Sequence, residues 1–152
     1  ISVKALCAAA DVNRSTFYAH YRNQYDLLAY IEAEALEDLK ARLLADGEPR
    51  TRNVEKILEY AKENADVFLM LLDESEGGFQ RQIMELAHLV DLQMSDQDAA
   101  VDADDLEYMY LFAVSGALGM LSHWLKKGTP QSPAEMSELL MSMIQHGVEE
   151  RA

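Results

Sequence analysis

The sequence contains little cysteine, proline or glycine, and acidic residues outnumber basic ones. Its one cysteine, Cys7, excludes a disulfide within the chain, which fits a reducing, cytoplasmic location. We interpret Cys7 as a small buried apolar residue. No apolar run approaches the roughly 20 residues that a membrane-spanning helix needs, so we expect no membrane partner.

The sequence also lacks the motifs of common catalytic sites. It contains no glycine-rich phosphate loop and no serine in a nucleophile elbow. Its four histidines have no partner at metal-ligand spacing, and none lies beside the cysteine. We therefore predict no metal site and no cofactor, and we do not expect an enzyme.

Apolar residues recur at helical spacing along nearly the whole chain, which predicts an all-α fold. "ADGEPR" contains the helix breakers Gly47 and Pro49 and predicts a boundary near residue 45. Expected helices cover residues 2–10, 14–22, 23–44, 54–64, a short segment from 66, 79–94, 104–127 and a segment from 132. Their expected N-caps include Ser2, Asn13, Asn23 and Ser132. Asn23 would pair with Asp26, and Ser132 would form a capping box with Glu135, with Pro133 at the first helical position.

Charge is distributed unevenly along the chain. The net charge is −14, yet residues 1–31 contain three basic and two acidic residues, and the remainder contains 10 basic and 25 acidic residues. Such an acidic protein should not bind nucleic acid non-specifically. If it binds nucleic acid, it must do so through the N-terminal segment.

The segment "NRSTFYAHYR" carries many hydrogen-bonding groups for its length. On a helical wheel Phe17 and Tyr21 share one face, and Ser15 and Ala19 point the opposite way. The short preceding helix and the tight connection "DVN" predict a helix-turn-helix, with Asp11 compatible with left-handed backbone. The outward face could enter a major groove, where hydroxyls address base edges and a methyl group contacts thymine. A two-helix corner is also common in proteins that bind no DNA, so an adaptor for other proteins remains the alternative.

The segment "ISVKALCAAADVNRSTFYAHYRNQYDLL" resembles the DNA-binding region of TetR/AcrR-type transcriptional regulators. Later segments, "LFAVSGALGMLSHWLKKG" and "SPAEMSELL", are similar to the last two helices of one subgroup. The chain departs from the family pattern at Gln24, where a phosphate-binding lysine is usual, and at Asp11, where glycine is common. The family's first helix is absent from the sequence and would precede Ile1. The matching positions are Ala10, Val12, Asn13, Thr16, Phe17, Tyr18, His20, Tyr21, Leu27 and Leu28.

The resemblance implies a role for each position of the N-terminal segment. Arg14, Ser15 and Thr16 would lie nearest the bases, and Tyr18 and His20 would reach phosphates. Ser2 and Lys4 would contact the DNA backbone from the preceding helix, and Asn13 would cap the recognition helix. The full set of expected DNA-binding residues is Ser2, Lys4, Asn13, Arg14, Ser15, Thr16, Tyr18, Ala19, His20, Arg22 and Gln24.

Residues 1–45 are thus expected to form the DNA-binding module with its connecting helix, and residues 46–152 a regulatory and dimerisation domain. All eight methionines and many aromatic residues lie in the second part. These residues suit either an ordinary core or a pocket for a small apolar effector, which the resemblance implies. The expected pocket residues are Phe68, Phe79, Ile83, Tyr108 and Phe112.

Small residues on the long helix, facing an apolar stripe on the last helix, predict a four-helix interface between two subunits. Packing within one subunit is the competing explanation for the small residues. The expected interface residues are Ser115, Gly116, Gly119, Met120, Trp124, Met136, Leu139, Leu140, Met143 and Gly147.

The sequence therefore predicts a dimeric, TetR-type repressor that binds a palindromic double-stranded DNA operator and is released by an effector. Its half-sites would lie about one helical turn, roughly 34–36 Å, or a multiple of it apart. Two alternatives remain: a helical interaction adaptor without DNA binding, and a DNA-binding regulator without a small-molecule effector. The helix from about residue 25 to residue 44 would transmit the signal, because it joins the two modules.

Overall fold

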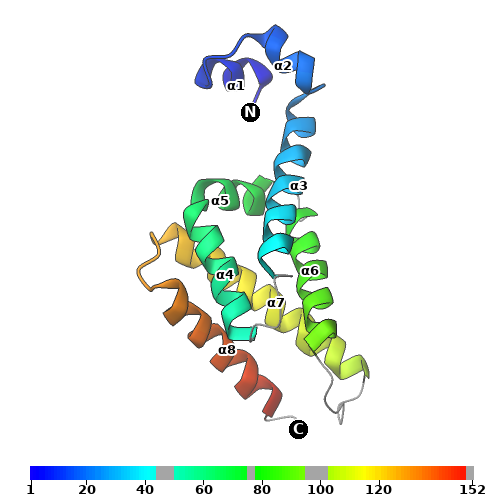
Figure 1. The fold of residues 1–152 in the computed structure, drawn as a ribbon, viewed down its shortest axis with the longest axis vertical. Coiled ribbons are helices and arrows are strands. Elements are labelled where there is room, and N and C mark those ends of the chain that lie inside the picture. The colour runs from blue at the N-terminus through cyan, green and yellow to red at the C-terminus, as the bar shows by residue number, and fades with distance from the viewer. Residues whose placement is uncertain (44–49, 75–77, 95–102, 150–152) are drawn as a thin grey trace. The chain divides into compact units, whose positions relative to one another are not determined.

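In the computed structural model the chain is helical (Figure 1). The structure describes residues 1–43, 50–74, 78–94 and 103–149, without the side chains of 50, 74, 88–94, 103, 106 and 147–149. No strand occurs in these ranges, which confirms the all-α prediction. The helices are α1 (Val3–Ala9), α2 (Arg14–His20), α3 (Gln24–Leu43), α4 (Arg50–Glu63), α5 (Ala65–Glu74), α6 (Gly78–Met94), α7 (Ala103–Lys126) and α8 (Pro133–Glu149).

The chain divides into two compact units, Ile1–Glu37 and Asp38–Ala152, and the division falls inside α3. The breakers from which the sequence placed a boundary near residue 45 lie outside the described residues. The last turns of α3 belong to the second unit because they bond to α4. The Tyr60 hydroxyl donates to Asp38 Oδ2 at 3.2 Å, and the Arg42 guanidinium lies 4.7 Å from the Tyr60 ring centroid.

A small core holds the first unit together. Val3 and Cys7 of α1 and Phe17 of α2 are buried against one another, and Tyr21 and Leu27 pack against them. Cys7 is thus a buried apolar residue, as expected. Leu6 of α1 is only half-buried, and Ala10 is exposed at the C-cap.

The turn after α1 fixes how the chain enters α2. The Val12 N–H donates to the Cys7 carbonyl at 2.9 Å, and Asp11 takes the left-handed backbone at φ 52°. This six-to-one bond with a left-handed residue before it is a Schellman motif, where glycine is the commonest residue. Aspartate tolerates the conformation better than most other residues with a side chain, so the prediction for Asp11 is confirmed.

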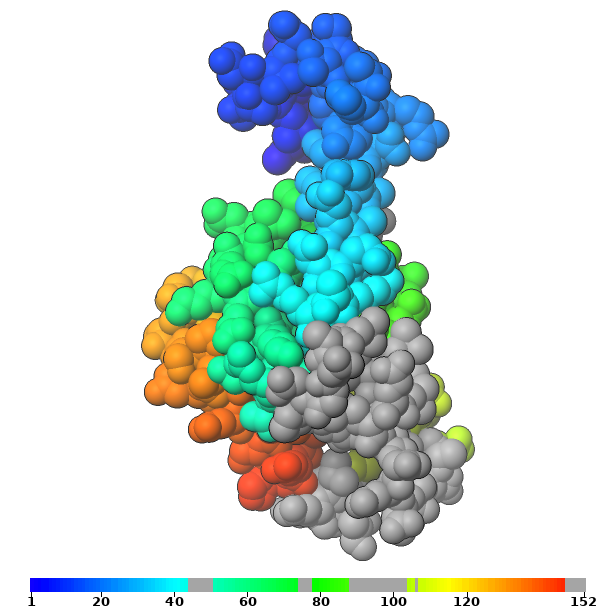
Figure 2. All heavy atoms as spheres, viewed as in Figure 1, coloured from blue at the N-terminus to red at the C-terminus, as the bar shows by residue number. Residues whose placement is uncertain are grey.

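The second unit is built around a chain of aromatic rings. Phe68 of α5 packs edge-on against Tyr60 of α4 and Phe79 of α6, with ring centroids 5.7 and 5.5 Å apart. All three are buried, and Phe68 and Phe79 are fully so, at 0% exposure. α4 lies alongside α8, and their atoms meet in the space-filling view (Figures 1 and 2). α7 contacts α4, α5, α6 and α8.

The connection between α7 and α8 follows the sequence prediction closely. Gly128 ends α7 at φ 79°, and the Thr129 N–H donates to the Trp124 carbonyl in a second Schellman motif. The capping box forms, because Ser132 Oγ accepts from the Glu135 N–H at 3.2 Å while Glu135 Oε2 accepts from the Ser132 N–H at 2.8 Å. The bond from the Ser132 N–H, followed by the bond from its hydroxyl, to Glu135 Oε2 lowers the pKa of Glu135. The Trp124 indole N–H donates to the Gln131 carbonyl at 3.1 Å and ties this connection to α7.

Replacing Asp11 tests the turn that orients α2. We expect Asp11→Val to lower the stability of the first unit by about 1–2 kcal/mol, because a β-branched residue is strained at positive φ. Protection of the Val12 amide proton from hydrogen exchange should fall about 5- to 30-fold. Asp11→Asn removes the same charge but tolerates the conformation, so its protection should stay near that of the parent chain. Equal losses in both variants would contradict the assignment.

Candidate nucleic-acid interface

α2 buries one face and exposes the other. Phe17 is buried in the core of the first unit, while Ser15, Thr16 and Ala19 are exposed on the rest of the helix. The inner and outer faces are those that the helical wheel predicts. The exposed face combines two small hydroxyl side chains with a methyl group, so the helix backbone can approach another surface closely.

Arg14 and Tyr18 are held together on the exposed side of α2. The Tyr18 ring packs edge-on against the buried Phe17, with centroids 5.5 Å apart, and Arg14 Cζ lies 5.9 Å from the Tyr18 centroid. Tyr18 remains 49% exposed. A buried ring therefore supports an exposed ring, which in turn lies beside a cation.

The structure corrects the role of Asn13. It occupies the N-cap position of α2 with extended backbone, but its side chain makes no capping hydrogen bond. Ser2 does cap α1, since its hydroxyl oxygen accepts from the Ala5 N–H at 3.2 Å. This bond uses an acceptor lone pair of Ser2 Oγ and leaves its O–H able to donate. Lys4 and His20 are exposed.

The structure also corrects the position of Arg22. The sequence placed it on the recognition helix, but α2 ends at His20, because Tyr21 turns to extended backbone at φ −132°. The Tyr21 ring packs against Phe17 and Tyr30, at centroid distances of 5.6 and 5.8 Å. Arg22 therefore lies in the connection to α3, with its side chain 88% exposed. Gln24, the first residue of α3, is half-buried.

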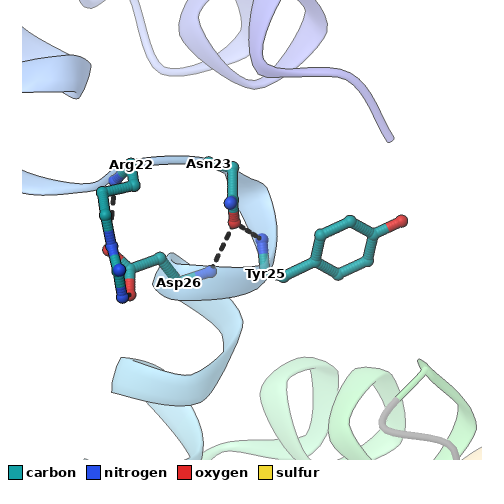
Figure 3. Close-up of polar contacts among 4 residues, drawn as sticks. All are labelled: Arg22, Asn23, Tyr25 and Asp26. Atoms are coloured by element: carbon teal, nitrogen blue, oxygen red, sulfur yellow. Dashed lines mark hydrogen bonds and ion pairs between the residues drawn. The ribbon is translucent and has the colours of Figure 1, made fainter.

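Arg22 and Asp26 form a bonded pair that the sequence reading missed (Figure 3). Arg22 Nη2 lies 3.2 Å from Asp26 Oδ1, and the Arg22 backbone N–H donates to Asp26 Oδ2 at 3.0 Å. These bonds lower the pKa of Asp26, the backbone bond most of all, and raise that of Arg22. Asn23 caps α3 as expected, because its side-chain oxygen accepts from the Tyr25 and Asp26 N–H groups. Asp26 reaches back past Asn23, to Arg22.

The five expected effector-pocket residues do not come together. Phe68, Phe79 and Ile83 are buried in the core of the second unit, whereas Tyr108 and Phe112 are 72% and 82% exposed on α7. Two described grooves in this unit are lined by other residues. Phe68 and Phe79 pack edge-on against each other, with ring centroids 5.5 Å apart.

The expected dimer-interface residues fall into two groups. Trp124, Met136 and Leu140 are buried within the subunit, and Met120 is half-buried. Gly147 lies outside the described side chains. A groove of about 470 Å³ between α7 and α8 is lined in part by Gly116, Gly119, Met136 and Leu139. The exposed group comprises Ser115, Gly116, Gly119, Leu139 and Met143.

The first unit is a helix-turn-helix, a motif that many DNA-binding proteins use, and a larger helical unit follows it. Residues 51–146 match the TetR-type family described as a transcriptional regulator C-terminal region. The chain belongs to the TetR-type family of transcriptional regulators.

The fold has a counterpart among solved structures. One structure, titled "Dihydroxyacetone kinase operon activator DhaS", matches with a TM-score of 0.64 over 98% of this chain and 85% of its own, at 18% identity. No curated protein matches the sequence. None of the described helices is apolar over a length that would cross a bilayer, and the described side chains form no group of three or more metal-ligand candidates.

Truncating Phe68 tests whether this ring is core or cavity wall. We expect Phe68→Ala to lower the free energy of unfolding by about 3–5 kcal/mol in urea titrations, because it removes a fully enclosed ring. Val67→Ala is the matched control on the same helix, since Val67 is 38% exposed and should change stability by less than about 1 kcal/mol. A loss from Phe68→Ala no larger than that of the control would indicate an open cavity.

Proposed function

We propose that this regulator binds a palindromic DNA duplex as a homodimer, with the exposed face of α2 in the major groove. The observation that carries the proposal is the division of α2 into a buried Phe17 and an exposed face of small and hydrogen-bonding side chains. Ser15 and Thr16 can bond base edges, and the Ala19 methyl can contact a thymine methyl. The exposed amide of Asn13 makes no cap bond and can also reach DNA.

Backbone contacts would come from residues on both sides of α2. Ser2 and Lys4 lie at the start of α1, and Tyr18, His20 and Arg22 are exposed at or after α2. Residues 1–31 contain three basic side chains, Lys4, Arg14 and Arg22, so a dimer offers six. Six neutralised phosphates correspond to a slope of log K against log salt of about 5 in magnitude. Affinity must then depend on geometry and on pairing of two subunits.

The proposed dimer surface is an apolar strip along α7 and α8. Tyr108, Leu111 and Phe112 are exposed at helical spacing on α7, and Ser115, Gly116 and Gly119 continue the same stripe toward its C-terminus. Leu139 and Met143 are exposed on α8, four residues apart. Two copies of this strip joined about a two-fold axis would bury it as a four-helix interface. Tyr108 and Phe112 thus fit a subunit contact better than an effector pocket.

The glycines of α7 favour contact with a partner over packing within the subunit. A Cβ atom built at Gly116 or Gly119 meets nothing within 4 Å. Glycine inside a helix is about 1 kcal/mol less favourable than alanine. The described part of the subunit therefore offers no packing reason for either glycine, whereas close approach of a second helix does.

Repression is the regulatory effect that we propose, because a dimer occupying an operator blocks polymerase without any further contact. The similar solved structure is titled an operon activator, so activation is the second candidate. Transcription in vitro from a promoter carrying the bound duplex separates them. Added protein should lower transcript yield, and a rise would establish activation.

The closed aromatic core supports a regulator without an apolar effector inside the second unit. Among the described residues, Phe68, Leu71 and Phe79 are fully buried. Phe68 and Phe79 pack against each other at the place where the sequence predicted the pocket wall, and this contact favours the alternative without an effector at that place. In either case α3 is the proposed transmitter, because it is the described helix with residues in both units.

DNA binding is tested by truncating the exposed face of α2. Duplexes selected from a random pool should share a palindrome, and Thr16→Ala and Tyr18→Ala should each weaken binding to it by about 5- to 150-fold. The measurement is fluorescence anisotropy at fixed salt. Val67→Ala, exposed on α5, should bind like the parent chain. Selection that yields no common sequence, with folded protein, would support the adaptor alternative.

Gly119→Ala should stabilise the monomer and weaken the dimer. The free energy of unfolding of the monomer should rise by about 0.5–1 kcal/mol, because alanine favours the helix and its methyl meets nothing in the subunit. The dimer should dissociate more readily in sedimentation experiments, because the methyl would separate the two α7 helices. Gly128→Ala is the contrasting control, since Gly128 needs positive φ; it should destabilise the subunit. An unchanged dimer constant in Gly119→Ala would argue against this interface.

A further inference from the structure

We infer that Asp26 is a positioning residue for DNA binding, which holds the Arg22 guanidinium where it meets a phosphate. The inference rests on the proposed function and deepens it, because Asp26 itself need not contact DNA. Its observation is the two-point contact between Asp26 and Arg22 at the start of α3 (Figure 3).

The contact restrains Arg22 at both ends. Asp26 Oδ2 holds the Arg22 backbone N–H at 3.0 Å, and Oδ1 holds Nη2 at 3.2 Å. Nη2 is one of three nitrogens in a guanidinium with five N–H donors. The side chain is 88% exposed, so most of the guanidinium surface stays available to a phosphate.

Asp26 is itself fixed by the cap of α3. The Asn23 side-chain oxygen accepts from the Asp26 N–H at 2.9 Å and from the Tyr25 N–H at 3.0 Å. The carboxylate therefore projects from a bonded first turn rather than from a loose segment. An arginine that is already restrained loses less side-chain freedom on binding.

Stability of the fold does not account for the guanidinium part of this contact. The bond from the Arg22 backbone N–H to Asp26 belongs to the start of α3, whereas an ion pair to an arginine side chain that is 88% exposed contributes little to stability. Residues 1–31 contain three basic side chains. Lys4 lies on α1 and Arg14 lies beside Tyr18 on α2, so Arg22 is the one in the α2–α3 connection, and the nearby Gln24 is uncharged. A phosphate near the α2–α3 connection would depend on Arg22.

Two effects of Asp26 on DNA affinity have opposite signs. The Arg22 bonds lower the pKa of Asp26, so this carboxylate stays ionised at neutral pH and repels phosphate. If repulsion were its main effect, removing the charge would strengthen DNA binding. If positioning dominates, removing the charge weakens binding, and it does so only when Arg22 is present.

A double-mutant cycle separates these effects. Binding to the selected duplex is measured for the parent chain, Asp26→Asn, Arg22→Gln and the double variant. We expect Asp26→Asn to weaken binding about 2- to 10-fold per subunit in the parent background. In the Arg22→Gln background, Asp26→Asn should leave affinity unchanged or raise it. Additive effects, or tighter binding by the single Asp26→Asn variant, would overturn the inference.

Further measurements distinguish a positioning role of Asp26 from an effect on folding and from a failure of the proposed function. Glu34→Gln removes one exposed carboxylate from the same helix, where Glu34 bonds Tyr30 rather than Arg22, and should not weaken binding. Protection of the Val12 amide reports whether Asp26→Asn leaves the first unit folded, and Asp26→Glu should recover part of any lost affinity. A parent chain that binds no duplex refutes the proposed function. A parent chain that binds, with Arg22→Gln equal to it, refutes only the inference.

Discussion

Burial of Phe17 is the contact on which the first unit depends. Its ring is buried in one cluster with Val3 and Cys7, which fixes the rotation of α2 about its axis. With seven residues, α2 is too short to be stable alone, so this anchor decides which side chains face outward. The residues that α2 exposes are therefore determined by the burial of Phe17 on its opposite face. One buried aromatic residue therefore positions the small, exposed side chains of α2.

The positions of the few basic side chains are likewise fixed by their neighbours. A chain with a net charge of −14 offers DNA few cations, so it cannot compensate for poor placement with general attraction. The chain has few basic side chains near α2, but two of them are restrained. Arg14 lies against the Tyr18 ring, and Arg22 is bonded at two points by the Asp26 carboxylate. In the proposed complex, such a surface would discriminate between duplexes more through geometry than through general electrostatic attraction. The acidic second unit would add to this discrimination, since it disfavours DNA contacts outside the N-terminal face.

Most local signals were read correctly from the sequence, apart from the missing cap bond of Asn13, and long-range ones were not. The bonds of Ser2, Asn23 and the Ser132–Glu135 box were predictable, because a cap involves residues at most three positions apart. The end of α2 was not, because Tyr21 leaves the helix to meet Tyr30. Aromatic residues of the second unit were grouped by type alone. Composition could not separate Phe68, enclosed by rings from two other helices, from Phe112, which extends from α7 into solvent.

In the proposed dimer, the open space around Gly116 and Gly119 would have a consequence for subunit choice. A cell with several related regulators contains many chains with similar helical faces, and mixed pairs would carry mismatched reading heads. Where two backbones must approach closely, a single methyl group on either chain keeps them apart. Such an interface would exclude a related chain that carries a larger side chain at either glycine position. The two glycines would thus favour pairing of identical subunits.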